Sequence, residues 1–388
     1  MKPPEVDQMQ WDLISGNDLG AAHGVASTKS VMQMARGQST TIDVRGGQFK
    51  FTFDRLVGGP RDGIDVLEID NGLLRTVVLP TRGMSLWKAW TKQGELGWQS
   101  PVKGPVHPNL VPIYDPNGLG WLEGFDELVV RCGLQSNGAP DFDANGKLIY
   151  PLHGRIGNLP ANCLSVMIDQ DAGTLKVVGS VMETRFLIQA LKLDVEYQFA
   201  INQSKIDCID TVTNLRSQPT TMQMLYHINI GSPMLEAGAK VVAAIDELAP
   251  RDAHAAKDVD HWDIYDGPTP GYAEQVYFAR PYADSRGWTT AVLQNADRSR
   301  AAAVRFDTRT LPYFNLWKNT VANEDGYVTG FEPATGFPNP RGFEEKHGRL
   351  VILGAGQSKV FAWQIESLED ATSIERALSE VRALQRSD

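Results

Sequence analysis

Short apolar runs recur along the chain after its N-terminal tenth, and clusters of Gly, Pro, Asn and Asp separate them. This pattern is typical of antiparallel strands joined by turns. In residues 191–199 apolar and polar residues alternate strictly, so one face of the predicted strand is buried and the other faces water. Residues 359–365 alternate in the same way. Further runs of this kind span 74–79, 175–178, 290–293, 302–306 and 350–353.

The two ends of the chain carry helical signals instead. Residues 5–37 are the least strand-like part, and Ser27–Ser30 followed by Val31–Ala35 predicts a short helix there. Near the C-terminus, Ser367 can cap a terminal helix. Apolar residues at helical spacing support that helix, namely Ile374, Ala377, Leu378, Val381 and Leu384.

Strands dominate and do not alternate regularly with helices, so the sequence predicts an all-β fold. A length of 388 residues favours two large packed sheets. No fixed-period repeat indicates a propeller, and no linker of low complexity divides the chain. We therefore predict one domain over 1–388, with an N-terminal appendage over 1–38, a β-sandwich over 39–367 and a C-terminal helix over 368–388.

The composition narrows the range of partners. A formal net charge of −10 disfavours nucleic acid and anionic membranes, because both bind clustered Lys and Arg. The three cysteines are widely spaced and form no Cys-x-x-Cys pair, so we expect reduced core residues. The N-terminus lacks the apolar segment of a secretory signal, and no stretch approaches the roughly 20 apolar residues of a membrane span. The expected location is the cytoplasm.

Residues 221–231 carry the first candidate for chemistry. As a strand, this segment would place His227 on one face with mostly polar company. That setting suits a group that exchanges protons, although a strand histidine can equally be a satisfied structural residue. The side chains predicted to share this face are Thr221, Gln223, Leu225, His227 and Asn229.

Glu332 is the second candidate. It ends a predicted strand and precedes a loop dense in Pro and Gly, so stiff backbone would hold it, as a base that must keep its geometry requires. Its spacing is equally compatible with a charged residue on a turn.

Histidine and arginine residues near glycines form a third group. His153 stands before Gly154 and Arg155, and this segment either donates hydrogen bonds to a ligand or forms a turn. Arg82 and Arg131 lie near glycines inside apolar sequence, where an unpaired arginine would be costly. Each is therefore either a ligand contact or part of a structural ion pair.

Aromatic residues near these segments could stack on the apolar face of a ligand, and Trp317 and Phe337 are candidates. Lys318, next to Trp317, is a further candidate contact. The acidic segment 258–263 resembles a metal cluster but fits a solvated loop better. The chain has no phosphate-binding glycine loop, nucleophile elbow or His-Glu-x-x-His motif.

Taken in chain order, these segments resemble the galactose mutarotase-like superfamily, in particular an aldose 1-epimerase-related family of unassigned substrate, formerly a domain of unknown function. The resemblance covers most of the chain. It rests on five segments in order, namely 80–84, 152–154, 226–229, 317–319 and 330–333.

The resemblance implies a large antiparallel β-super-sandwich and an enzyme that interconverts sugar anomers without a cofactor. By similarity, His227 supplies the acid, Glu332 the base and His153 a sugar contact. Asn229, Trp317 and Lys318 are expected near the sugar as well. The arginines Arg82, Arg131 and Arg155 exceed what neutral hydroxyls require, so we expect at least one to bind the ligand, and an anionic sugar is one option.

Two rival functions stay open at this stage. A lyase or glycosidase on a related sandwich would need a wide cleft and a second carboxylate or a tyrosine base. A non-catalytic sugar-binding or sensing protein would keep the pocket without turnover.

Overall fold

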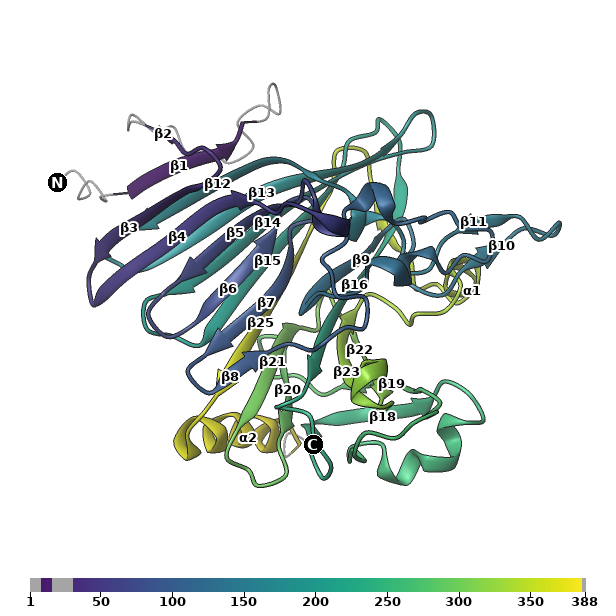
Figure 1. Ribbon diagram of the computed structural model, residues 1–388. Coiled ribbons are helices and arrows are strands. Elements are labelled where there is room, and N and C mark those ends of the chain that lie inside the picture. Colours follow the sequence, from purple (N-terminus) through teal and green to yellow (C-terminus); the bar gives the residue numbers. More distant parts are fainter. Residues whose placement is uncertain (1–7, 16–30, 386–388) are drawn as a thin grey trace.

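The computed structural model describes residues 8–15 and 31–385. Two large sheets of mainly antiparallel strands account for most of them, which confirms the predicted β-sandwich (Figure 1). The first sheet runs in the order β17 (Lys240–Ala243), β20 (Trp288–Gln294), β21 (Ala301–Asp307), β25 (Ser358–Leu368), β15 (Lys205–Asn214), β14 (Gln189–Ala200), β13 (Thr174–Arg185), β12 (Ala161–Asp169), β1 (Gln8–Ile14) and β2 (Met32–Gln33).

The second sheet carries the candidate residues for chemistry. It runs in the order β18 (Ile245–Pro250), β19 (Gln275–Pro281), β22 (Tyr313–Asn319), β23 (Val328–Ala334), β16 (Thr220–Gly231), β9 (Val129–Leu134), β7 (Ser85–Thr91), β6 (Arg75–Leu79), β5 (Asp65–Asp70), β4 (Gly47–Arg55) and β3 (Gln38–Val44). Two short strands extend it, β24 (Val351–Leu353) beside β16 and β8 (Gly94–Leu96) beside β7. A separate hairpin consists of β10 (Asp141–Phe142) and β11 (Leu148–Tyr150).

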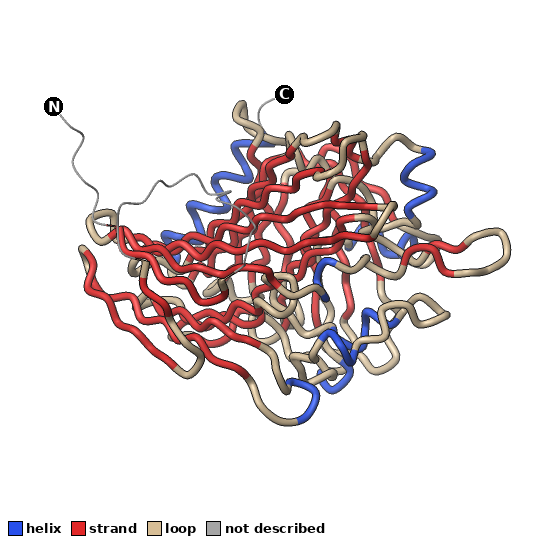
Figure 2. Tube along the Cα trace, turned by 90° about the horizontal axis from the view of Figure 1, so that it is seen from above, coloured by secondary structure: helices blue, strands red, loops and turns tan. Residues whose placement is uncertain are grey.

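Helices are few and lie at the margin of the strands (Figure 2). The α-helices are α1 (Arg341–Lys346) and α2 (Ala371–Gln385). The 3-10 helices are η1 (Gly59–Arg61), η2 (Pro108–Leu110), η3 (Gly120–Gly124), η4 (Ile156–Asn158), η5 (Ala255–His261) and η6 (Asn323–Asp325). In the described part of the chain, no helix has the length and apolar character needed to cross a membrane.

The main core lies between the two sheets and draws side chains from both. β14 illustrates how the sequence builds it, because its alternate residues are almost fully buried while the residues between them are half-buried. The period-two prediction for this strand is therefore confirmed. Each apolar side chain buried in this way stabilises the fold by about 1.5–3 kcal/mol.

The two ends differ from the predictions. Ser27–Ser30 lie outside the described residues, and Met32–Gln33 form an edge strand parallel to β1 instead of a helix. At the C-terminus the helix exists, but Asp370 caps it, because its Oδ1 accepts from the Ser373 amide at 2.9 Å. Ser367 does not cap it, since it lies within β25, before the helix begins at Ala371, and its amide donates to Ser204 O at 2.9 Å.

Candidate active site

Strand β16 has one face in the main core and the other on the opposite side of the second sheet. Its even-numbered residues from Met222 onward join the main core, as alternation along a strand requires. His227 and Asn229 therefore point the other way, on the face predicted from the sequence. Pairing of Ile228 with Phe331 sets His227 directly opposite Glu332 on the neighbouring strand β23.

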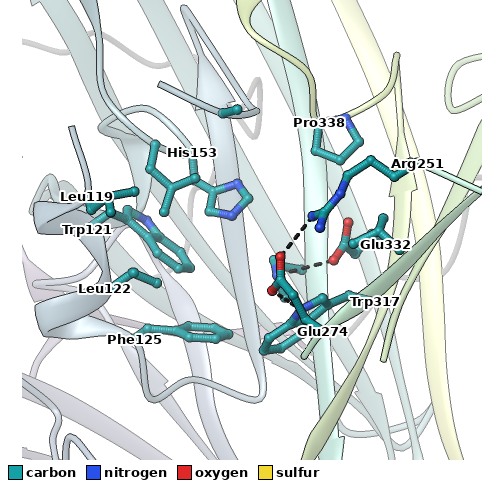
Figure 3. A pocket seen from close by; sticks show the side chains of 14 residues that line it. Leu119, Trp121, Leu122, Phe125, His153, Arg251, Glu274, Trp317, Glu332 and Pro338 are labelled. Carbon is teal, nitrogen blue, oxygen red and sulfur yellow. Dashed lines mark hydrogen bonds and ion pairs between the residues drawn. The ribbon is translucent and has the colours of Figure 1, made fainter. Parts of the chain in front are cut away.

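A cavity of about 330 Å³ opens over this face, and both groups line it. Figure 3 shows aromatic and leucine side chains on one wall, and Arg251, Glu274 and Glu332 on the other. The lining consists of Leu119, Trp121, Leu122, Phe125, Ala139, Leu152, His153, His227, Arg251, Glu274, Val276, Trp317, Glu332 and Pro338.

His227 and Glu332 form a buried pair, with Nε2 of the imidazole 3.2 Å from Oε1 of the carboxyl. The other ring nitrogen, Nδ1, lies 2.6 Å from Oδ1 of Asn229. Asn229 is oriented by its own amide group, which donates to Glu127 O at 3.0 Å. Because Oδ1 of Asn229 can only accept, Nδ1 of His227 carries a hydrogen, and Nε2 is left for the contact with Glu332.

The surroundings of this acid/base pair favour its uncharged form. Burial raises the pKa of the Glu332 carboxyl well above its ordinary value. Burial, with a contribution from His153, lowers the pKa of His227 to about 3. The rings of Phe125 and Trp317 lie 5.1 and 5.3 Å from the imidazole, centroid to centroid, and help exclude water. One proton is therefore shared between the Glu332 carboxyl and Nε2 of His227. The preferred arrangement leaves this proton on Glu332, so that both groups are uncharged.

His153 adds a hydrogen-bond acceptor to the cavity. Its Nδ1 donates to Asn137 O at 2.9 Å, and burial lowers its pKa to about 4, so Nε2 of the neutral ring can accept from a ligand hydroxyl. The backbone here is unusual, since His153 has φ 56° and Gly154 has φ 71°. A Cβ on Gly154 would stand 2.3 Å from Gly133 O, so only glycine lets this segment lie against β9.

The polar wall ends in an exposed ion pair. Arg251 follows β18 and Glu274 precedes β19, and Nη1 of the arginine lies 2.8 Å from Oε1 of the glutamate. The other oxygen of Glu274 accepts from Nε1 of Trp317 at 2.7 Å. Arg251 also contacts Asp252 at 3.0 Å through Nε. These bonds hold the Trp317 ring in the cavity wall.

Two of the predicted arginine contacts lie elsewhere and bind other protein groups. Arg131 is on the core face of β9 and forms a fully buried ion pair with Asp210 at 2.5 Å, because adjacent strand residues point to opposite faces. Arg82 is buried behind the apolar wall. It binds Glu127 at 2.6 Å and donates to Gly124 O at 2.9 Å, so it supports the segment that carries Trp121 and Phe125.

Three more predicted contacts do not line the cavity. Arg155 is half-buried. Burial raises the pKa of Glu183, and the positive charge of Arg155 partly offsets this rise. Lys318 points away from Trp317 and donates to Ile264 O at 2.7 Å. Asn229 contacts the imidazole of His227 and influences the cavity only through that ring. Trp317 and His153 do line the cavity.

The acidic segment 258–263 shows no metal geometry. In the described ranges, no group of three or more His, Cys, Asp and Glu side chains is arranged to hold a metal ion. His261 contacts Asp258 at 3.3 Å on the surface, far more exposed than the acid/base pair.

Sequence reasoning missed most of the cavity wall. Trp121 lies in the short 3-10 helix η3 and Phe125 directly follows it, and a helix of this length shows no periodicity that marks a face. Arg251 and Glu274 are far apart in the chain and become neighbours through the pairing of β18 with β19. The flanking of Trp121 by Gly120 and Gly124 is the one local signal that could have pointed to this wall.

Comparisons with known proteins agree with this architecture. Residues 61–366 match a family described as a domain of unknown function, DUF4432. A candidate aldose 1-epimerase from Klebsiella pneumoniae subsp. pneumoniae MGH 78578 is 32% identical, with a TM-score of 0.89 over 98% of this chain and 96% of that one.

More distant solved structures share the fold alone. A galactose mutarotase-like protein from Clostridium acetobutylicum has 14% identity and a TM-score of 0.57, over 82% of this chain and 98% of that one. A candidate aldose 1-epimerase from Escherichia coli K12 has 12% identity and a TM-score of 0.52, over 79% of this chain and all of that one (100%). No curated protein matches the chain.

Proposed function

The chain belongs to the DUF4432 family, and we propose that it is a sugar mutarotase, which interconverts the α and β anomers of a free sugar. The observation that carries this proposal is the contact of 3.2 Å between His227 and Glu332 in the cavity. The related protein from Klebsiella, named as a candidate aldose 1-epimerase, supports the same reaction class. We also propose that the chain acts as one domain in the cytoplasm.

In the proposed reaction, the proton shared by the pair passes from Glu332 to Nε2 of His227 when the sugar binds. A carboxylate oxygen of Glu332 then takes the proton of the C1 hydroxyl while Nε2 of His227 gives its proton to the ring oxygen. The bond between C1 and the ring oxygen breaks, and C1 becomes a carbonyl carbon. Rotation about the C1–C2 bond and reversal of both transfers close the ring on the other face. The same two groups serve both directions, and the reaction requires neither metal nor organic cofactor.

The electrostatics of the pair suit this sequence of transfers. Ring opening converts a carboxylate and an imidazolium into a carboxylic acid and a neutral imidazole. Burial favours that neutral state, because it raises the pKa of Glu332 and lowers that of His227. The surroundings thus stabilise the pair as it stands after ring opening. Before ring opening, the sugar hydroxyls hydrogen-bond to the charged Glu332 and His227.

A lyase or glycosidase fits the cavity less well. Such an enzyme needs a second free carboxylate or a tyrosine base. The other carboxylate of the lining, Glu274, is bound to Arg251 and Trp317. Tyrosine is absent from the cavity lining among the described residues.

The test is anomer exchange measured by saturation-transfer NMR on a panel of free sugars, with the wild type and Glu332→Gln. Glutamine keeps the shape of the side chain but cannot take the C1 proton. We expect kcat to fall on the order of a hundred to ten thousand fold, with binding of the sugar largely retained.

His227→Asn is the partner variant, since it removes the donor to the ring oxygen. The losses in the double variant should not multiply, because both groups serve one ring-opening step. Wild-type exchange by Glu332→Gln would overturn the assignment. Tight binding of a sugar without exchange by the wild type would favour a sensing protein.

A further inference from the structure

The polar groups of the cavity lie at its floor and on one side of its mouth, and the rest of the lining is apolar. The acid/base pair and His153 form the floor, where C1 of a sugar must lie. The exposed pair of Arg251 and Glu274 marks the mouth. Between and opposite them the lining is apolar, as Figure 3 shows for the wall from Leu119 to Phe125.

Two leucines of this wall are held at the surface instead of in a core. Leu119 and Leu122 are 43% and 46% exposed, yet both line the cavity. Their apolar surface is available to a ligand that reaches from the floor to the mouth. Neither side chain can accept or donate a hydrogen bond, so a hydroxyl placed against them would lose its partners in water.

The cavity also lacks a free positive charge. Among the described residues of the lining, Arg251 is the one permanent cation, and Glu274 and Asp252 already neutralise it at 2.8 and 3.0 Å. Both lining histidines are neutral near pH 7. An anionic group would therefore find no free cation and would lie beside the Glu274 carboxylate.

We infer that the substrate is an uncharged deoxy sugar, in which a methyl group replaces the hydroxymethyl group that projects from C5 of the ring. This inference rests on the proposed function, because that reaction places C1 at the acid/base pair. The methyl group would pack against Leu119 and Leu122. An uncharged substrate differs from the anionic sugar that the arginine residues in the sequence suggested as one option.

The test compares 6-deoxyhexoses with their parent hexoses and with the matching uronates, in the galacto, gluco and manno configurations and in both D and L forms. NMR exchange rates give kcat/KM for each sugar. We expect at least one 6-deoxy sugar to exceed its parent by about 10- to 100-fold, which is the range for a hydroxyl added in an apolar pocket. Every uronate should be slower still.

Equal kcat/KM for parents and deoxy sugars, or a preference for a uronate, would overturn the inference and leave the mutarotase proposal standing. If no sugar exchanges, the mutarotase proposal fails, and calorimetric affinities for the same panel decide the ligand class separately. Tighter binding of deoxy sugars would then support the inference, and equal or absent binding would overturn it.

Variants of the apolar wall give a second, independent readout. Leu119→Asn and Leu122→Gln offer a hydrogen-bond partner at the mouth and should reduce the preference for the deoxy sugar by at least about fivefold. Leu110→Asn is a control, because Leu110 is also exposed, at 57%, but does not line the cavity. An unchanged preference in both wall variants would overturn the placement of the methyl group.

Discussion

Gly330 lies beneath the acid/base pair, and Gly330→Ala tests whether the spacing of that pair sets the rate. An alanine Cβ would stand 2.9 Å from Oε1 of Glu332 and 3.0 Å from Cε1 of His227, whereas ordinary contacts begin at 3.4 Å. The two side chains must therefore shift by roughly 0.5 Å or more. A misplacement of about 1 Å can cost ~100-fold in rate, so we expect kcat to fall by about 10- to 100-fold.

The fold should survive this substitution. Overpacking costs about 1–3 kcal/mol, and the loss of glycine freedom in the unfolded chain offsets about 0.4–1 kcal/mol of it. Anomer exchange by NMR and urea unfolding would be measured on the same samples. Gly354→Ala is the control, because its Cβ meets only the flexible end of Gln357 at 3.4 Å. A folded Gly330→Ala protein with wild-type kcat would refute the role of the spacing.

Three further outcomes follow from the same contacts. The kcat/KM should show no acid limb near the ordinary histidine value of 6.5, because the pKa of His227 is lowered to about 3 and that of His153 to about 4, while the pKa of Glu332 is raised. An inflection near 6.5 would contradict this. Asn229→Asp should move the acid limb to higher pH, since a carboxylate beside Nδ1 stabilises the imidazolium; an unmoved limb would show that another group titrates there. Arg131→Met leaves Asp210 buried without its cation and should lower the free energy of unfolding in urea by about 3–5 kcal/mol with KM unchanged. A raised KM at wild-type stability would restore a ligand role for Arg131.

Alternation along strands is what made much of the fold predictable. Residues 191–199 alternate so regularly that the buried face of β14 follows directly from the sequence. The same rule predicted that His227 and Asn229 share a face, and the structure agrees. It also explains why Arg131 and Lys318 lie away from the cavity, since each is one residue removed from a side chain on the cavity face.

The wall of the cavity was beyond such reasoning. Trp121 and Phe125 belong to the short 3-10 helix η3 and its C-terminal end, and Arg82 holds this segment through Glu127 and the Gly124 carbonyl. The position of this segment depends on contacts between residues tens of positions apart. Strand order poses the same problem, because the pairing of β16 with β23 brings the acid to the base across more than a hundred residues. A hydrophobic pattern records which face is buried but not which strand lies next to it.

The apolar surroundings of the pair link the chemistry of the site to its choice of substrate. Phe125 and Trp317 exclude water from His227, and this exclusion favours the neutral state reached on ring opening. The same lack of polar groups gives a hydroxyl on the apolar wall no protein partner in exchange for the water that it displaces. A site that accepts a fully hydroxylated sugar would need polar groups along that wall, and these would partly resolvate the pair. An apolar substituent on the substrate avoids this conflict, because it completes the exclusion of water.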